Sequence, residues 1–296
     1  LHSSNDMYGA SKIFLNIIKI LNQQDYETHI ILPYKGPLDN ILKNYSDKIE
    51  HYNLGVLRKK YFNLLGLIDR TYNILKSILF LSNYIKKNKI DVVYTNTSTI
   101  IAGGFAARLN KISSFVHIHE MPINKLYFTV LKKVLNRISN KVILVSNAVK
   151  NHWNFVCQPK VHLVYNAAFQ SNNCKEAKKL KKGLIFTSVG RLIPYKGHKY
   201  LLEIAKKLIN HDPKVIFYII GDTLPSYKKY ELSLKRYVLE NNLENNIFFI
   251  GFKYDVKSYL KSSNFFIHTA IEPDPLPTVI LESISTNTPV ISTSLG

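Results

Sequence analysis

The residues with the clearest chemical character lie near the end of the 296-residue chain, in the run Asp274-Pro275-Leu276-Pro277-Thr278-Val279-Ile280-Leu281-Glu282. An apolar run of strand length precedes it, and the apolar residues that follow have helical spacing. Pro277 suits the first position of that helix, because its fixed φ and missing N–H cost nothing there. The amides of Thr278 and Val279 then lack an acceptor within the helix and point forward, which favours a phosphate group in front of them.

Two acids flank this predicted helix start at a spacing of eight residues. Asp274 lies on the loop in front, and Glu282 lies roughly one and a half turns into the helix, where a carboxylate can hold two vicinal hydroxyls. The geometry suggests a diphosphate between a ribose, held by Glu282, and a sugar near Asp274. Glu272 is not assigned, because its spacing to Glu282 is ten. A proline-bracketed loop with incidental acids remains the alternative.

A second element with chemical character runs from Gly190 to Gly197 and carries Arg191 and Lys196. It follows a predicted buried strand, residues 184–189, and precedes an amphipathic helix that extends to Ile209. Arginine offers a planar fork of donors and lysine a mobile point charge, so the pair can surround a diphosphate. Two cations near a turn are also common as solvated surface groups.

Together these elements resemble the family-four, group 1 retaining glycosyltransferases of the GT-B fold. The first resembles their E-x7-E signature in its acid-Pro-Leu-Pro-Thr form, with Asp274 where many members have glutamate. The second resembles their Gly-Arg and Lys-Gly element. The resemblance implies that the donor's pyrophosphate binds Arg191 and Lys196, that Asp274 acts on the transferred sugar, and that the nucleobase lies near Phe252. It also implies donor contacts for three residues of the first element: Leu276, Thr278 and Val279.

The N-terminal half matches further positions of this family. His119-Glu120 ends a predicted strand and resembles a His-acid pair whose histidine lies near the donor sugar; a hydrogen bond to a neighbouring loop is the alternative. His117 is expected in the core. Tyr8-Gly9 occupies the place of the glycine-rich turn that follows the family's first strand, so Gly9 is a predicted substrate-binding residue and that strand is expected to be missing.

Strands that alternate with helical patterns predict an α/β fold of two doubly wound, parallel-sheet domains of the Rossmann type, facing across a cleft. We expect an N-terminal domain at residues 1–170, a polar linker at 171–182 and a C-terminal domain at 183–296, with both domains incomplete at the chain ends. A fragment that folds poorly alone is the expectation. The predicted strands are residues 28–32, 49–54, 91–95, 114–119, 141–145, 161–165, 184–189, 215–220, 247–250, 265–270 and 290–293.

Composition adds a strong positive charge, with 40 basic and 20 acidic residues and a net charge of +20. The first 170 residues hold 22 of the basic and 9 of the acidic side chains. This excess suggests an anionic partner, either a phosphate-bearing substrate or a membrane surface, although a biased composition rich in Lys, Asn and Ile would produce it too. The apolar pattern at residues 61–87 can rest on an anionic bilayer, but a buried domain helix is favoured.

Two features bear on location. The two cysteines, Cys157 and Cys174, lack metal or redox spacing and suggest a reducing compartment. No uninterrupted apolar run approaches about 18 residues. We therefore expect a cytoplasmic protein, with possible peripheral contact to the inner face of the plasma membrane through the basic N-terminal domain.

The resemblance implies transfer of a sugar, with retention, from a UDP- or GDP-linked donor to a hydroxyl of a saccharide or lipid-linked acceptor, in cell-surface polysaccharide or glycolipid synthesis. No cofactor or metal is expected, because the chain shows no Asp-x-Asp element or His/Cys cluster. One alternative is a sugar-nucleotide epimerase of the same architecture, which would need further acid and base carboxylates. The other is a basic nucleic-acid-binding protein, which is disfavoured because no nucleic-acid motif is recognised.

Overall fold

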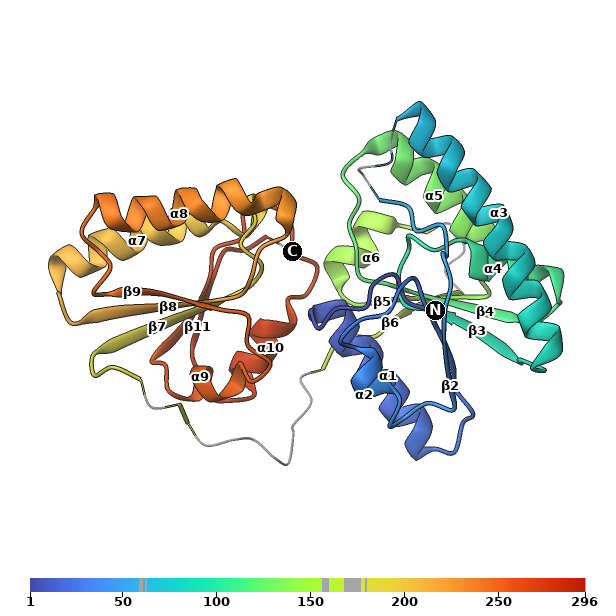
Figure 1. Ribbon diagram of the computed structural model, residues 1–296, viewed down its shortest axis with the longest axis horizontal. Coiled ribbons are helices and arrows are strands. Elements are labelled where there is room, and N and C mark those ends of the chain that lie inside the picture. The colour runs from blue at the N-terminus through green and yellow to red at the C-terminus, as the bar shows by residue number, and fades with distance from the viewer. Residues whose placement is uncertain (59–60, 62, 156–159, 168–176, 179, 296) are drawn as a thin grey trace. The chain divides into compact units, whose positions relative to one another are not determined.

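The chain folds into two compact units, residues 1–166 and 167–296, in the computed structural model (Figure 1). The structure describes residues 1–58, 61, 63–155, 160–167, 177–178 and 180–295. Each unit contains parallel strands joined by helices, the arrangement that the alternating sequence pattern predicts.

In the first unit the described strands form a two-stranded sheet, β1-β2, and a four-stranded sheet, β3-β4-β5-β6. Leu1 and His2 lie between the two sheets. The His2 amide donates to Ile31 O at 3.4 Å on one side, and Leu1 bonds Tyr94 and Asn96 on the other. The bounds are β1 (His29–Leu32), β2 (Lys48–His51), β3 (Val92–Thr95), β4 (Ser113–Ile118), β5 (Lys141–Leu144) and β6 (Val161–Leu163).

The helices of the first unit cover both faces of these sheets, with α1 and α2 on one side and α3, α4 and α5 on the other (Figure 1). Small residues of α4, such as Ala106 and Ala107, are fully buried and let α3 pack closely on the sheet. Trp153 in α6 is also fully buried. The bounds are α1 (Gly9–Gln23), α2 (Asp39–Leu42), α3 (Leu64–Lys87), α4 (Ala102–Leu109), α5 (Lys125–Ile138) and α6 (Asn147–Trp153).

The second unit has a five-stranded parallel sheet of order β11-β10-β7-β8-β9 among its described residues. Helices α7 and α8 lie on one face and α9 and α10 on the other (Figure 1). Every residue of β8 is buried, as expected for a strand covered on both faces. The bounds are β7 (Leu184–Val189), α7 (His198–His211), β8 (Val215–Ile220), α8 (Lys228–Glu240), β9 (Ile247–Gly251), α9 (Lys257–Lys261), β10 (Phe265–His268), α10 (Thr278–Ile284) and β11 (Val290–Ser292), with short 3₁₀ turns η3 (Pro194–Lys196) and η4 (Pro225–Tyr227).

The predicted strands are all present, but most are shorter than expected. The second ends at His51 rather than residue 54 because the chain turns there, and Gly55 adopts a positive φ of 63°. Much of the predicted linker, residues 171–176 and 179, lies outside the described residues. The Lys178 amide donates to Ser258 O at 2.9 Å, so this part of the linker packs on the second unit.

Candidate functional site

Two predicted site residues meet at the carboxyl edge of the second unit's sheet. β7 and β10 are neighbouring parallel strands, so the loops that follow them emerge side by side. Lys196, at the end of η3 after β7, forms an ion pair with Oδ2 of Asp274, on the loop after β10. His268 Nε2 lies 3.3 Å from the same oxygen, without hydrogen-bond geometry. The structure thus joins the two halves of the predicted diphosphate and sugar site.

Glycine is required directly after Lys196 by a close approach of the two loops. Gly197 has a φ of 71°, and a Cβ there would lie 1.8 Å from Thr269 O. The Thr269 hydroxyl donates to the carbonyls of Lys196 and Gly197, at 3.2 Å each. The Ile271 amide donates to Tyr195 O at 2.9 Å. These contacts hold Lys196 beside the loop that carries Asp274.

The Asp274 carboxyl is ionised at neutral pH. Its burial opposes ionisation, but the nearby His268 and the Lys196 cation outweigh that effect and hold the Asp274 pKa below its usual value. The Lys196 and Asp274 side chains are each 20% exposed, so the pair remains open to a ligand. Arg191 begins the same loop, and its positive charge partly offsets the effect of burial, which raises the pKa of Tyr195.

The predicted helix start is present, one residue later than expected. α10 begins at Thr278, and Pro277 is the residue before it, with an extended ψ of 121°. Within the described part of the chain, the amides of Thr278 and Val279 have no hydrogen-bond acceptor. Glu282 is buried in the same helix, with 8% of its surface exposed, whereas Glu272 is exposed on the loop.

The remaining predicted residues of the second unit lie near the same sheet edge. Leu276 is partly exposed on the loop between β10 and α10. Phe252 directly follows β9, and its ring meets the Tyr254 ring edge-on at 4.9 Å. The role of Phe252 with the nucleobase stays a prediction.

In the first unit, His119 directly follows β4 and bonds to Asn96, which directly follows β3. His119 Nε2 lies 2.9 Å from Asn96 Oδ1, and Asn96 Nδ2 donates to Ala10 O at 3.0 Å. Ala10 follows Gly9, the first residue of α1, so the predicted turn and the predicted histidine share one partner. Since the Asn96 amide nitrogen is the donor to Ala10, Oδ1 accepts, and His119 carries its proton on Nε2.

His119 lies in a group of neutral histidines with His117 and His2. Its ring lies 4.3 Å from that of His117, whose Nδ1 is 2.7 Å from the Tyr94 hydroxyl. Burial lowers the pKa of His117 to about 4, and burial with nearby histidines lowers that of His119 well below its usual value. His2, 3.2 Å from Asn96 Nδ2, has a pKa of about 4 for the same chief reason. His117 is buried, as predicted for a core residue.

Sequence reasoning missed Asn96 and the structural role of Glu120. The Glu120 carboxylate accepts from the hydroxyl of Thr97 and from the amide and hydroxyl of Ser98, at 3.1 and 2.9 Å. It therefore fixes the loop that carries Asn96. The Trp153 indole in turn donates to Glu120 O at 2.8 Å. The signal that could have found Asn96 was its position, because Asn96 directly follows β3, the strand beside the one that His119 follows.

The described residues contain no group of three or more His, Cys, Asp or Glu side chains placed to hold a metal ion. None of the helices that the structure describes is long and apolar enough to cross a membrane.

Comparison with known families decides the identity of the fold and the class of reaction. Residues 7–168 match the model of Glycosyltransferase Family 4, and residues 170–296 match that of Glycosyl transferases group 1. The chain belongs to the family 4, group 1 glycosyltransferases. The predicted family is thereby confirmed, and sugar transfer is favoured over the epimerase alternative.

Two relatives match most of the length of this glycosyltransferase. The UDP-Gal:alpha-D-GlcNAc-diphosphoundecaprenol alpha-1,3-galactosyltransferase of Escherichia coli is 27% identical over 97% of this chain and 76% of its own. An uncharacterized glycosyltransferase of Methanocaldococcus jannaschii is 28% identical over 77% of this chain and 59% of its own.

Solved structures confirm the GT-B fold of this glycosyltransferase. Anabaena HepE in complex with UDP-glucose superimposes with a TM-score of 0.81 at 19% identity, over 100% of this chain and 80% of its own. The lipopolysaccharide outer core galactosyltransferase WaaB gives a TM-score of 0.66 at 15% identity, over 99% and 80%. The predicted class, two parallel-sheet domains of the Rossmann type, is correct.

Proposed function

We propose that this glycosyltransferase moves a hexosyl group from a UDP-linked donor to a hydroxyl of a lipid-linked saccharide, with retention of configuration. Two findings support the proposal. The Escherichia coli relative acts, by its name, on UDP-Gal and a diphosphoundecaprenol-linked sugar. Anabaena HepE, which shares the fold, binds UDP-glucose. Such an acceptor belongs to a membrane, so we further propose action at the inner face of the plasma membrane.

The ion pair between Lys196 and Asp274 is the observation that carries the proposal. Lys196 is assigned to the donor's diphosphate and Asp274 to its sugar. The bond that breaks in transfer lies between these two parts of the donor. A site in which the two assigned groups touch therefore matches the place where charge changes during the reaction, positive on the sugar and negative on the diphosphate.

The transfer balances with the residues present. The bond from the anomeric carbon to the leaving phosphate oxygen breaks with its electron pair staying on oxygen, and the acceptor oxygen forms the new bond to that carbon. The acceptor's proton passes to the leaving phosphate oxygen. Lys196 and Arg191 compensate for the charge on the diphosphate, helped by the Thr278 and Val279 amides, while the ionised Asp274 favours the cationic sugar. Glu282 holds the ribose.

His119 is proposed to contact the transferred sugar through Nδ1. Because the Nε2–H group donates to Asn96 Oδ1 and the ring is neutral, Nδ1 is a hydrogen-bond acceptor suited to a sugar hydroxyl. The low pKa of His119 makes it a weak base at neutral pH, so it orients the sugar and takes no proton.

A donor screen tests the proposal. The purified chain is incubated with UDP-galactose, UDP-glucose, UDP-N-acetylglucosamine or GDP-mannose, together with a diphosphate-linked lipid sugar as acceptor. We expect transfer from a UDP-hexose, with the donor's anomeric configuration kept in the product by NMR. Transfer only from GDP-mannose, or an inverted product, would contradict the proposal.

We also propose that transfer needs no divalent metal, because Lys196, Arg191 and the amides of Thr278 and Val279 are already assigned to the diphosphate. Activity is measured in EDTA and after adding back Mg²⁺ or Mn²⁺. Full activity in EDTA is expected; activity that is lost in EDTA and restored by one metal would overturn this part of the account.

A further inference from the structure

Helix α3 exposes an apolar stripe that the domain core does not use. Its second half packs inward through Ser77, Leu81, Tyr84 and Ile85. Residues 64–79 include seven large apolar side chains between 48% and 79% exposed: Leu64, Leu65, Leu67, Ile68, Tyr72, Leu75 and Leu79. Leu64, Ile68, Leu75 and Leu79 recur at helical spacing on one side. The favoured prediction of a buried helix therefore holds only for the side of α3 that carries Ser77, Leu81, Tyr84 and Ile85.

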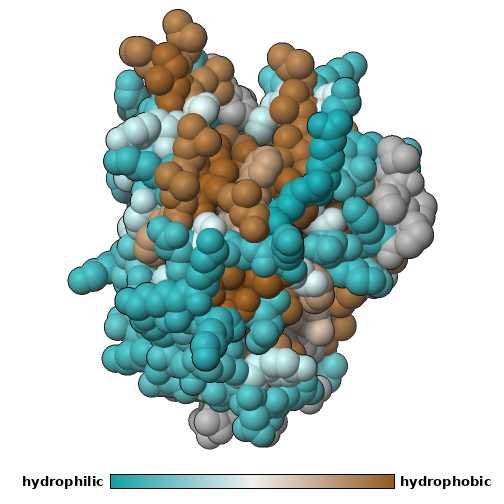
Figure 2. Space-filling model, turned by 90° about the vertical axis from the view of Figure 1, so that its right-hand side faces the viewer, coloured by the Kyte–Doolittle hydropathy of each residue, from teal (hydrophilic) through white to brown (hydrophobic). Residues whose placement is uncertain are grey.

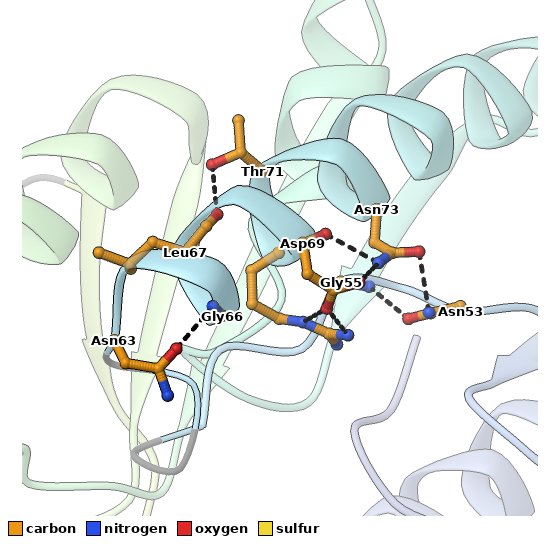
Figure 3. A network of polar contacts seen from close by, with 9 residues as sticks. Asn53, Gly55, Asn63, Gly66, Leu67, Asp69, Thr71 and Asn73 are labelled. Carbon is orange, nitrogen blue, oxygen red and sulfur yellow. Dashed lines mark hydrogen bonds and ion pairs between the residues drawn. The ribbon is translucent and has the colours of Figure 1, made fainter.

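A network of polar contacts joins α3 to the loop that follows β2 (Figure 3). Asn73 Nδ2 donates to Asp69 Oδ1 at 2.9 Å, and Asn53 Nδ2 donates to Asn73 Oδ1 at 2.9 Å. Asn53 lies on the loop after β2, so this network ties the helix to the domain. The Asn63 side chain caps the first turn by accepting from the Gly66 amide at 2.7 Å. Asn73 thus bonds to the domain, whereas the seven large apolar side chains named above are exposed.

Helix α5 repeats the pattern beside α4, against which α3 also packs. Ile123, Leu126 and Val130 are 72%, 77% and 55% exposed, at spacings of three and four residues. The same row continues toward the C-terminus with Lys133 and Arg137. Figure 2 shows apolar side chains gathered in ridges at one end of this face of the molecule. We call the exposed apolar residues of α3 and α5 named above, together with Ile123, the apolar face.

The charge around the apolar face is of one sign. α3 and α5 together contain one acidic residue, Asp69, which is paired with Arg70. Their basic residues are Arg70, Lys76, Lys86, Lys87, Lys125, Lys132, Lys133 and Arg137. Exposed apolar side chains flanked by lysine and arginine are complementary to the acyl boundary and the anionic headgroups of a membrane surface.

We propose that the apolar face docks the first unit on an anionic lipid bilayer. Leu64, Ile68, Leu75 and Leu126 enter the acyl boundary, and Lys125, Lys133 and their neighbours meet the headgroups. The inference rests on the proposed function only in that a lipid-linked acceptor would lie in the same membrane. Its test needs neither donor nor acceptor, so its failure leaves the proposed sugar transfer untouched.

The test is sedimentation of the whole chain with vesicles of phosphatidylglycerol and phosphatidylcholine in equal parts, or of phosphatidylcholine alone. We expect binding to the vesicles that contain phosphatidylglycerol, and we expect this binding to weaken at high salt. Ile68→Ser with Leu75→Ser should lower partitioning at least about tenfold, because two apolar side chains leave the acyl boundary. Lys125→Glu with Lys133→Glu should weaken binding to the anionic vesicles.

The matched control is Leu232→Ser with Leu239→Ser on α8 of the second unit. These leucines have the same spacing and similar exposure, 54% and 63%, against 60% and 57% for Ile68 and Leu75. Full binding by this control supports the proposal. Three outcomes would overturn it: no binding by the unmodified chain, equal loss in both double variants, or a solution dimer that Ile68→Ser with Leu75→Ser converts to monomer.

Discussion

The carboxyl edges of the two units differ in charge: one carries a charged pair of predicted site residues, and the other carries a predicted site residue in a neutral network. In the second unit, Lys196 and Asp274 are charged, paired and one-fifth exposed. In the first, His119 and His117 are neutral and desolvated, in a network of uncharged partners around Asn96. A partly exposed charged pair suits a diphosphate, which exchanges one ionic partner for another. A neutral network suits sugar hydroxyls, which need directed hydrogen bonds without net charge.

This difference follows from the residues that come directly after the strands in each unit. In the second unit the turns use glycine where loops touch: Gly197 against Thr269 O, and Gly221, whose Cβ would lie 1.9 Å from Gly190 O. In the first unit the strands end in Asn96 and His119, whose side chains bond across the edge. In the second unit the loops meet through their backbones, which leaves the Lys196 and Asp274 side chains available for a ligand. In the first unit the side chains bond to one another, and these contacts order the candidate site.

Acidification should produce the largest difference in stability between the two units. His2 and His117 titrate near 4 in the folded protein and near 6.5 when unfolded, so the unfolded state binds more protons between these values. The free energy of unfolding therefore falls as the pH falls from 6.5 toward 4, by about 2 kcal/mol per histidine at pH 5. In the second unit His198 contributes one such group, while Asp274 loses its contribution only below its usual pKa of 3.8.

The single tryptophan, Trp153, reports on the first unit because it is fully buried there. Urea unfolding followed by its fluorescence should shift to clearly lower urea at pH 5 than at pH 7. Hydrogen exchange of β8 amides gives the matched measurement for the second unit and should change less. A tryptophan transition that does not move would show that the histidines are not held neutral.

Asp274→Asn should reduce catalysis while sparing diphosphate binding. The variant removes a negative charge assigned to the cationic sugar, so kcat should fall about 10²- to 10³-fold, the cost typical of one electrostatic group in the transition state. Nucleoside diphosphate affinity should stay the same or rise, because Lys196 loses its anionic partner. Steady-state kinetics and calorimetry measure both; weaker diphosphate binding would show that the assignment of Asp274 is wrong.

Gly197→Ala should destabilise the second unit more than Gly251→Ala, although the two glycines have nearly equal φ, 71° and 73°. The positive φ costs about 1–2 kcal/mol at either position. At Gly197 the new Cβ also overlaps Thr269 O, which adds about 1–3 kcal/mol, whereas no atom lies within 4 Å of the Gly251 position. The urea midpoints of the second unit in the two variants test this prediction. Equal losses of stability would show that the close approach of Thr269 O to Gly197 adds no cost.

The elements that carry the candidate site of the second unit could be predicted from the sequence because they lie in short local motifs. The run from Asp274 to Glu282 specifies a loop and a helix start, and α10 begins within one residue of the expected position. Strands 184–189 and 215–220 have the predicted bounds because continuous apolar runs between turn residues mark buried strands. The contact between Lys196 and Asp274 arises from the tertiary structure, so the local motifs do not specify it and the resemblance implies it only indirectly.

The first unit was harder to predict because its site is assembled from separate strand ends. Asn96 carries no local motif, and its role arises from strand order, which brings β3 beside β4. Helix α3 was misjudged for a similar reason. Its apolar pattern covers most sides, and only the fold shows that Asn73 bonds to Asn53 on the domain while Ile68 and Leu75 are exposed.

The central claim, that Lys196 serves the diphosphate and Glu282 the ribose, is tested most directly by calorimetric titration of Lys196→Ala with uridine diphosphate and with uridine. Loss of one charge-assisted contact should weaken uridine diphosphate by about 1.5–3 kcal/mol, roughly ten- to hundredfold, and leave uridine unchanged. Lys199→Ala, an exposed lysine three residues further along, is the matched control and should bind both ligands normally. Glu282→Ala should weaken both ligands by similar factors. Equal weakening of uridine and uridine diphosphate by Lys196→Ala would contradict the account.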